Sequence, residues 1–552
     1  MSVRRRRLQF ASSVDELAVW DESLLELVTQ KPGSLGKFMK LVDNGILFTS
    51  SFSGWDAPRE AWRVFAAKLQ SHVGRSIVAH HALSCDIGAM QRAILEQYSH
   101  AEGSHACVHV DIIQQLASEA AEYVQSLCVP SCSSADDDIK LRSMANSHIR
   151  DFLRKNEWVF HEGCTSFCTV HKRQCPVFPM GAWRSAQSDA AEVDDVVERL
   201  EKRSRVQQPW WTMDPRSFGF GTEEPLSIDV SSPPCVDWSV RGKQQGAAGP
   251  SEPSHWTYLA KRKSAAKARL EHLYFFECTR RYPIHEQVAF LDETHDIVHI
   301  TWSPCQGGFP TNRKRLYAAG VARWSHVWVG PSTAADVQAD FEASFSRGLI
   351  LNGDCYLHHD PVLHEADLQK KALGTAFKKL PPSWRTMCFD ELLPYILSPS
   401  ALGRFTAWHT HRKAQINSRL SAGSAFLFDL DQNSDHGEGG SLFPTQTRHH
   451  SIYSCSSQVF ATDVDCWAAL GLDCSEAFAA GRGLSPVYKA MRTHTSKQQQ
   501  QLRGNSMHVP TVAAWLVYVM SNMVAREAAS PQGLSLVQVC ESSSSDDEGC
   551  LE

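Results

Sequence analysis

Three apolar segments of strand length constrain the fold of the first part of the chain. They cover residues 45–52, 77–79 and 107–110. In the chain between them, apolar residues recur at the spacing of a helix. Alternation of strand and helix predicts a parallel, doubly wound sheet. Ligands of such sheets bind at the carboxyl ends of the strands. The residues expected at these ends are Gly54, Asp86 and Asp111.

The rest of the chain changes character several times. Strand-like runs resume at 226–230, 273–276 and 297–300, whereas residues 330–455 lack a regular rhythm and carry Gly-rich polar turns. We therefore expect an α/β, Rossmann-like sheet with a smaller irregular domain. The expected segments are a helical extension (1–44), a first half of the sheet (45–112), an insertion (113–222), a second half (223–329), the irregular domain (330–455), a return to the sheet (456–525) and a disordered acidic, Ser-rich tail (526–552).

Length, charge and cysteine content limit the classes of protein. A chain of 552 residues exceeds one compact core, so two or three domains are expected. A net charge of −6 argues against global attraction to nucleic acid, so a nucleic-acid enzyme needs a local basic cleft. We find no apolar run of about 18 residues, and no membrane span is expected. Seventeen cysteines without a secretory signal indicate reduced thiols, of which special ones are catalytic or metal-bound.

A cysteine behind two prolines is the most informative position for chemistry. Cys235 follows the strand-like run 226–230 and the pair Pro233-Pro234. Such a cysteine lies on a rigid turn at the rim of the sheet, and its thiolate is a nucleophile if a cation or a helix end lowers its pKa. Taken alone, the segment also fits a small buried hydrophobic residue.

Four motifs in order favour the nucleophile. Pro-Cys235 is followed by Trp238, Ser239 and Gly242, and this segment resembles the catalytic motif of the cytosine-5 DNA methyltransferase family. Three later segments are similar to that family's following motifs. They are Phe275-Phe276-Glu277, Arg313-x-Arg315 and Gly504-Asn505-Ser506. Cys278, Thr279 and Thr311 depart from the family pattern.

The resemblance implies a site for S-adenosylmethionine in the first half of the sheet. The family has Phe-x-Gly-x-Gly after the first strand, and here Asp56 stands at the second glycine. Asp86 is expected to receive the ribose hydroxyls and Asp111 the adenine amino group, while Asp56 would accept from the cofactor's amino group. Without the resemblance, Asp86 and Asp111 are helix N-caps. The expected cofactor contacts are Phe52, Ser53, Gly54, Asp56, Asp86, Asp111, Ile112, Pro234, Asn505 and Ser506.

The resemblance also implies a reaction. Cys235 would add to C6 of a cytosine, Glu277 would hold N3 and the exocyclic amine, Arg313 would contact O2, and Arg315 would order the site. The segment 330–455 would be the target-recognition domain. Its candidate contacts to nucleic acid are Lys378, Lys379, Trp384, Arg385, Arg404, Trp408, His411, Arg412, Lys413 and Arg419.

A second group of soft ligands lies in the insertion. Cys164, Cys168, His171 and Cys175 fall within twelve residues, and three cysteines with one histidine suit a tetrahedral zinc site. The alternative is a set of plain reduced cysteines in a folded insertion.

Three functions remain open at this stage. The first is DNA cytosine-5 methylation, with DNA as partner and S-adenosylmethionine as methyl donor. The second is the same chemistry on transfer RNA, and the third is a catalytically silent nucleic-acid-binding scaffold on the same fold. The basic run Arg4–Arg7 favours the nucleus, with the cytoplasm as the alternative if the run is a solvated tail.

Overall fold

The computed structural model covers most of the chain. It describes residues 11–30, 33–101, 106–128, 135–190, 220, 223–239, 242, 244–358, 360–374, 379–418, 424–435, 437 and 439–526. Several features discussed above lie outside these ranges. They are the basic run Arg4–Arg7, Lys378, Arg419, and the acidic tail beyond 526.

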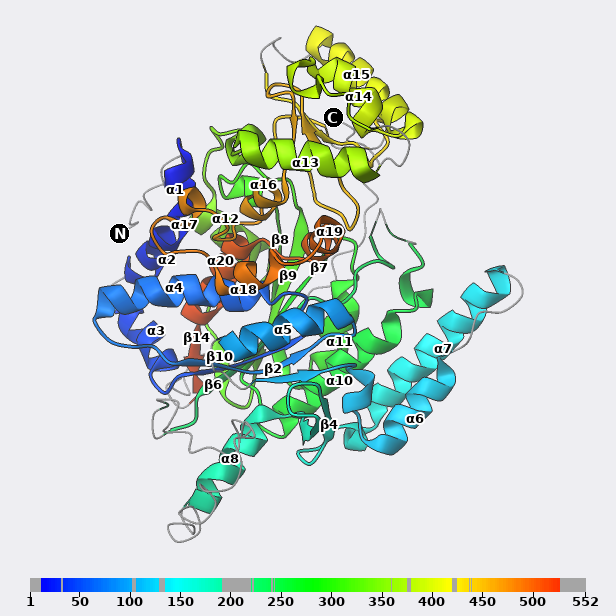
Figure 1. Cartoon of the computed structure of the whole chain (residues 1–552). Coiled ribbons are helices and arrows are strands. Elements are labelled where there is room, and N and C mark those ends of the chain that lie inside the picture. The colour runs from blue at the N-terminus through cyan, green and yellow to red at the C-terminus, as the bar shows by residue number, and fades with distance from the viewer. Residues whose placement is uncertain are drawn as a thin grey trace, which may run out of the picture.

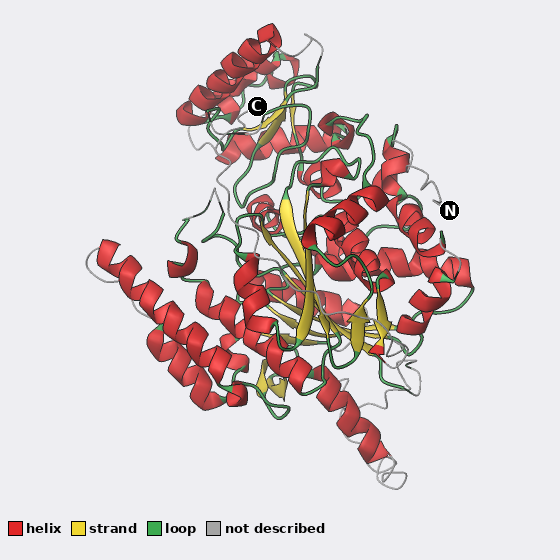
Figure 2. Cartoon of the chain, turned by 180° about the vertical axis from the view of Figure 1, so that it is seen from behind, coloured by secondary structure: helices red, strands yellow, loops and turns green. Residues whose placement is uncertain are grey.

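A nine-stranded sheet forms the centre of the molecule (Figures 1 and 2). Its strand order is β5-β4-β3-β2-β1-β6-β7-β9-β8. The five strands from β3 to β7 run parallel, whereas β9 runs antiparallel to β7 and β8, and a hairpin of β4 and β5 extends the other edge. The strands are β1 (Ile46–Ser51), β2 (Ala79–Cys85), β3 (Cys107–His109), β4 (Thr165–Cys168), β5 (Arg173–Pro176), β6 (Leu226–Ser231), β7 (Leu273–Thr279), β8 (His295–Trp302) and β9 (Arg315–Ala322).

Alternate residues of the strands enter two different cores. Ile46 and Phe48 of β1 pack into one core, while Leu47 between them packs into the other. This alternation follows from the two-residue repeat of a strand, and it explains why β1 is buried throughout although its last three residues are polar. The doubly wound α/β fold expected from the sequence is therefore confirmed.

Helices cover both faces of the sheet. The core on the first face receives α1 (Val14–Ala18), α2 (Trp20–Thr29), α3 (Ser34–Val42), α4 (Ala57–Val73), α5 (Ala89–Ala101), α12 (Ala334–Phe345), α18 (Pro486–Met491) and α20 (Val509–Ser521). The core on the second face receives α6 (Ser118–Leu127), α7 (Ala135–Lys155), α8 (Pro179–Ala190), α10 (Glu252–Lys267) and α11 (Ile284–Leu291). In Figure 1, α6 and α7 project as an arm from the body, and α8 projects separately.

A small lobe has its own core. It is built from residues between Ala372 and Phe460, and Figure 1 shows it at the top of the molecule. It contains α13 (Pro361–Gly374), α14 (Phe389–Ile396), α15 (Pro399–Ser418), β11 (Leu427–Asp429), β12 (Ile452–Ser454) and β13 (Val459–Phe460). The expected irregular domain began earlier, at 330, but α12 packs on β8 of the main sheet.

The chain then returns to the main body. The remaining elements are β10 (His326–Trp328), α16 (Asp463–Ala468), α17 (Glu476–Ala479), α19 (Ser496–Gly504) and β14 (Met523–Ala525). Short 3₁₀ helices cover Ile113–Gln115, Glu157–Val159, Gly246–Ala248, Pro304–Gln306, Gly353–Tyr356 and Trp384–Thr386. Among the helices described here, none has the combined length and apolar character that crossing a bilayer requires.

A buried ion network links α10 to the underside of the sheet. Arg262 of α10 lies 3.0 Å from Asp229 of β6 and also pairs with Glu271. Asp229 further accepts hydrogen bonds from Thr49 of β1 at 2.8 Å and from Tyr258 at 3.2 Å. Because every charged group of this network has a partner, β1 and β6 can be joined in a dry core.

The close packing of β9 against β7 gives a stability prediction. An added Cβ at Gly320 of β9 would lie 2.0 Å from the buried ring of Tyr274. We expect Gly320→Ala to destabilise the fold by about 1–3 kcal/mol, measured as a lower melting temperature. In Gly403→Ala, where no described atom lies within 4 Å of the new Cβ, the melting temperature should stay the same or rise. Equal melting behaviour of the two variants would contradict the packing.

Candidate active site

The sheet reverses its winding between β1 and β6, and the two strands lie side by side. Their register runs from Ile46↔Leu226 to Thr49↔Asp229. At the carboxyl ends, the Ser51 amide donates to Ser231 Oγ at 2.9 Å. The loop after β1 and the loop after β6 therefore leave the sheet from one point, which is where doubly wound sheets bind ligands.

Cys235 lies on a pinned turn after β6. Its carbonyl accepts from the amides of Trp238 and Ser239 at 3.1 and 2.8 Å, which closes a helical turn. The Trp238 indole donates to Glu252 at 2.8 Å and anchors the turn to α10. Pro233 is buried, Pro234 is exposed and Cys235 is half-buried. Cys235 is therefore partly accessible to solvent, and the turn that carries it is held in place by hydrogen bonds.

The neighbouring strands bring the other predicted catalytic residues to this turn. Glu277 is 4% exposed near the end of β7, which pairs in parallel with β6. Its carboxylate accepts from Ser232 Oγ at 2.9 Å and lies 3.2 Å from Nε of Arg315, the first residue of β9. Ser232 and Arg315 thereby bridge the cysteine turn, β7 and β9.

The electrostatics of this group favour a thiolate. The pKa of Cys235 is lowered to about 6 because its sulfur receives a hydrogen bond from the Cys278 thiol, and the positive charges of Arg315 and Arg313 add to this against the effect of burial. Cys278 is fully buried, and burial raises its pKa well above the usual range. Cys278 therefore acts as the donor and Cys235 as the charged acceptor.

Arg313 has a different placement from the one expected. Its guanidinium is buried and donates to the backbone carbonyls of Ser506 and, at 3.4 Å, Gln446. Burial, with a contribution from Arg315, lowers its pKa to about 10. Two of its N–H groups thus donate to backbone carbonyls of the protein itself. We therefore assign Arg313 to joining the segment before β12, the Ser506 motif and the start of β9, and not to contacting a base.

The loop after β1 has an unusual backbone. Phe52, Gly54 and Asp56 all have positive φ values, of 55°, 57° and 67°. Such a conformation costs a residue with a side chain about 1–2 kcal/mol, so the strain at Phe52 and Asp56 must be supported by their surroundings. Phe52 packs edge-on against Tyr258 at 6.0 Å, and the amide of Asp56 donates to the Ser53 carbonyl at 2.8 Å.

Asp86 organises the same loop. Its two carboxylate oxygens accept from the amides of Gly54 at 2.9 Å and Gly88 at 2.8 Å. Burial raises its pKa, opposed by these amides and by the charges of Arg92 and Arg448. Asp86 thus holds the ends of β1 and β2 together, and each oxygen retains a lone pair for a further donor.

Asp111 and Ile112 follow β3. The Asp111 carboxylate caps the amide of Ile113 at 3.0 Å, and burial raises its pKa. Ile112 is only 2% exposed and belongs to the core of the second face. Asp111 keeps a half-exposed position suited to a ligand, whereas Ile112 is a core residue.

Asp56 is turned away from the expected cofactor position. Its side chain is 1% exposed, and its Oδ2 lies 3.1 Å from Nε2 of His81 on β2. Burial lowers the pKa of His81 well below its usual range, so the ring is neutral. We therefore assign Asp56 to supporting the loop from inside instead of accepting from a cofactor.

The Gly-Asn-Ser motif lies opposite this loop. Asn505 is exposed and its side-chain oxygen accepts from Arg448 Nε at 3.0 Å. Ser506 is buried, and its hydroxyl donates to the Met507 carbonyl at 2.9 Å. Arg448 thus links Asn505 to the loop after β2, because its positive charge also acts on the Asp86 carboxylate.

The expected zinc ligands are only partly brought together. Cys168, His171 and Cys175 lie in one group, but the fourth member is Cys107 of β3 and not Cys164. Cys164 lies one residue before β4, and four residue-to-residue steps of extended chain separate its Cα from that of Cys168 by about 13 Å. Its sulfur instead accepts from the amide of His161 at 3.3 Å.

The small lobe keeps most of the residues predicted to contact nucleic acid at its surface, but not all of them. Trp408 is fully buried and stacks on Phe428 at 5.1 Å, so it is a core residue and cannot stack on a base. Arg385 pairs with Glu365 and lies over the ring of Trp384 at 4.7 Å. Half-exposed or exposed positions remain for Lys379, Trp384, Arg385, Arg404, His411, Arg412 and Lys413.

Sequence reasoning missed Ser232, Cys278 and Arg448. The first two stand next to recognised motif residues, so their positions were visible but their contacts were not. Arg448 lies in an irregular segment, and its nearness to Asp86 depends on the return of the chain from the small lobe.

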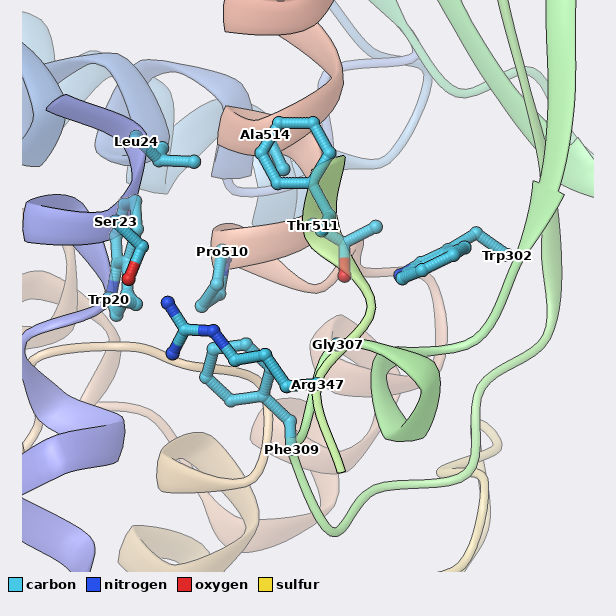
Figure 3. Close-up of a pocket in the computed structure, with 11 residues that line it drawn as sticks. Trp20, Ser23, Leu24, Trp302, Gly307, Phe309, Arg347, Pro510, Thr511 and Ala514 are labelled. Atoms are coloured by element: carbon cyan, nitrogen blue, oxygen red, sulfur yellow. The ribbon is translucent and has the colours of Figure 1, made fainter. Parts of the chain in front are cut away.

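A separate apolar pocket lies between α2, α20 and the segment around Phe309 (Figure 3). The side chain of Arg347 extends across it between Trp20 and Phe309. Its lining contains none of the residues predicted for the site. The pocket is therefore distinct from the group around Cys235.

Comparisons with known proteins give weak likenesses. No family model and no curated protein matches the chain. Similar solved structures include a mutant DNMT2 of Spodoptera frugiperda, with TM-score 0.36 and 10% identity over 86% of this chain and 99% of that one. The Dnmt2 methyltransferase of S. pombe has TM-score 0.35 and 11% identity over 85% and 96%. EhMeth, a methyltransferase of Entamoeba histolytica, has TM-score 0.35 and 11% identity over 86% and 98%.

The electrostatics predict the reactivity of Cys235. Its iodoacetamide modification, followed by peptide mass spectrometry, should rise with pH to a plateau with a midpoint near pH 6, because the thiolate dominates above that pH. Arg315→Gln should move the midpoint upward, whereas Lys314→Gln, at an exposed neighbouring position, should leave it in place. A wild-type midpoint near that of a free thiol, about 8.5, would contradict the described environment.

Proposed function

We propose that this chain is an S-adenosylmethionine-dependent methyltransferase that acts on C5 of cytosine, with DNA as the leading substrate. One observation carries the proposal. A half-buried cysteine with a lowered pKa lies at the switch point of a doubly wound sheet, where the carboxylate of Glu277 and the guanidinium of Arg315 act on it.

Cys235 is the proposed nucleophile. At neutral pH its sulfur is largely the thiolate, whose electron pair forms a bond to C6 of the ring. Addition at C6 makes C5 electron-rich, so that C5 could form a bond to the donor's methyl carbon, while the bond from that carbon to the sulfonium sulfur would break and its electron pair would stay on the sulfur. Loss of the C5 proton to a base returns an electron pair to the ring, and the C6–sulfur bond breaks to restore the thiolate. The Cys278 thiol, Arg315 and Arg313 stabilise the thiolate before it adds to C6 and after it is released.

Glu277 is proposed to hold the cytosine edge at N3 and the exocyclic amine. Its carboxylate is fixed by Ser232 and Arg315, so it needs little reorganisation when a base arrives. Arg315 also provides positive charge where the ring gains negative charge. Arg313 acts through the backbone, because its donors hold the carbonyls of Gln446 and Ser506.

The residues after β1, β2 and β3 fit an adenosyl sulfonium ligand. Gly54 has no described atom within 4 Å of an ideal Cβ, so the loop is open at that point. Asp86 and Asp111 offer carboxylate oxygens for ribose hydroxyls and the adenine amino group, and Asn505 lies across from them. When bound, S-adenosylmethionine supplies the methyl group from its sulfonium. Burial of Asp56 against His81 removes one expected contact, and Phe52, Ser53 and Pro234 remain at the rim.

The small lobe is proposed to bind the nucleic acid. A cytosine inside a duplex must leave the stack before it can reach Cys235, at a cost of a few kcal/mol. Basic side chains on α15, including Arg412 and Lys413, can contact phosphates while Trp384 and His411 offer rings to bases. The basic run Arg4–Arg7 supports a nuclear location in this proposal, with the cytoplasm as the alternative.

A transfer assay tests the proposal. The purified chain is incubated with methyl-labelled S-adenosylmethionine and either duplex DNA or transfer RNA. We expect label in C5 of cytosine, and Cys235→Ser should reduce transfer by at least about 10³-fold because it removes the nucleophile. The matched control is Cys388→Ser, which changes an exposed cysteine at the N-cap of α14 into a residue that also caps helices well.

The substrate arms separate the alternatives. Label in transfer RNA and not in DNA would replace the leading substrate while keeping the chemistry. Transfer that persists in Cys235→Ser would refute the mechanism. Binding of nucleic acid without methyl-donor binding or transfer would favour a silent scaffold on this fold.

A further inference from the structure

The insertion carries a hairpin that is attached to the edge of the main sheet. β4 pairs antiparallel with β3 through His109↔Cys168, and the amide of Thr169 donates to the Val108 carbonyl at 2.8 Å. β5 completes the hairpin, with Cys168 opposite Arg173 and Ser166 opposite Cys175. Few backbone contacts join β3 to the hairpin, so the side chains at this edge decide how firmly it is held.

Four soft ligand atoms converge at this edge. They come from Cys107 of β3, Cys168 of β4, Cys175 of β5 and His171 in the turn, and all lie within 4.8 Å of one another. His171 Nδ1 is 3.3 Å from Cys168 Sγ and 3.7 Å from the sulfurs of Cys107 and Cys175. In a tetrahedral zinc centre, the bond lengths imply separations of about 3.6 Å between nitrogen and sulfur. The three nitrogen–sulfur distances therefore lie close to those that a single zinc ion requires, and the sulfur atoms are near enough to share it.

The backbone around Cys168 supports a metal-bound sulfur. The amides of Val108 and His171 point at its Sγ, at 3.4 and 3.5 Å. A turn closes beneath it, because the amide of Lys172 donates to the Cys168 carbonyl at 2.9 Å and Lys172 has a left-handed φ of 54°. Amide donors around a coordinating thiolate fix its direction and offset part of its charge.

The surroundings exclude a surface cluster. Cys107, Cys168 and Cys175 are each no more than 1% exposed, and His171 is half-buried. None of the three cysteines forms a disulfide in the structure described here. Three thiolates and one imidazole fill a tetrahedral zinc shell completely, which is the pattern of structural and not of catalytic sites.

We propose that Cys107, Cys168, His171 and Cys175 bind one structural zinc ion that fastens the β4–β5 hairpin to β3. The site is independent of Cys235 and of methyl transfer. It joins residues more than sixty positions apart in the sequence, and one of them, Cys107, lies four residues before Asp111. Zinc therefore stabilises β3, the strand from which the Asp111 loop leaves the sheet.

Metal content and a matched pair of variants test the site. The full chain, purified under reducing conditions with zinc in the growth medium, should contain about one zinc per molecule by inductively coupled plasma mass spectrometry. Cys107→Ser should lose the zinc, while Cys164→Ser should keep it, because Cys164 is also a buried cysteine near the β4–β5 hairpin but lies outside the ligand group. Absence of zinc from the wild type, or loss in Cys164→Ser with retention in Cys107→Ser, would overturn the proposal.

A second measurement covers the case in which Cys107→Ser does not fold. Wild-type chain depleted of zinc by a chelator is titrated with cobalt(II). We expect one equivalent to give the visible bands of tetrahedral cobalt together with thiolate-to-cobalt charge transfer, and zinc to displace it. Octahedral cobalt spectra, or none of these bands, would contradict a three-cysteine site even without any variant.

Discussion

The parallel alignment of β1, β6 and β7 is the constraint on which the rest of the site depends. β6 lies between the other two, and the parallel direction brings all three carboxyl ends to one edge. The loop of Gly54, the turn of Cys235 and the carboxylate of Glu277 meet there for that reason alone. Arg315 arrives from the opposite direction, because β9 is antiparallel to β7 and begins where β7 ends. The buried Arg262–Asp229 pair holds the central strand in this position.

Local electrostatics, and not the net charge, give Cys235 its character. The chain as a whole is acidic, yet the sulfur is near two guanidinium groups and a thiol donor. Cys278 is buried beside Cys235, and its thiol hydrogen-bonds to the Cys235 sulfur.

The sequence predicted those features that depend on local periodicity. Apolar strand runs located β1, β3, β6, β7 and β8, whereas β2 (Ala79–Cys85) lies almost entirely after the run predicted at 77–79. Gly54, Asp86 and Asp111 follow β1, β2 and β3 at the carboxyl edge of the sheet, as expected. Features that depend on contacts between distant segments were not predictable in the same way. Cys107, and not Cys164, lies near Cys168, His171 and Cys175. The reason is that β3 pairs with β4, although α6 and α7 separate the two strands in the sequence. Asp56 is buried beside His81 of the neighbouring strand, and Trp408 belongs to the separate core of the small lobe.

The most direct test of the central claim is covalent trapping of the cysteine. Duplex DNA containing 5-fluorocytosine, and a matching RNA, are incubated with the chain and S-adenosylmethionine, and the denatured product is mapped by peptide mass spectrometry. Because fluorine does not leave as a proton does, the C6–sulfur bond should persist, and the adduct should map to Cys235. An adduct on another cysteine such as Cys278, or no adduct with either nucleic acid, would contradict the account.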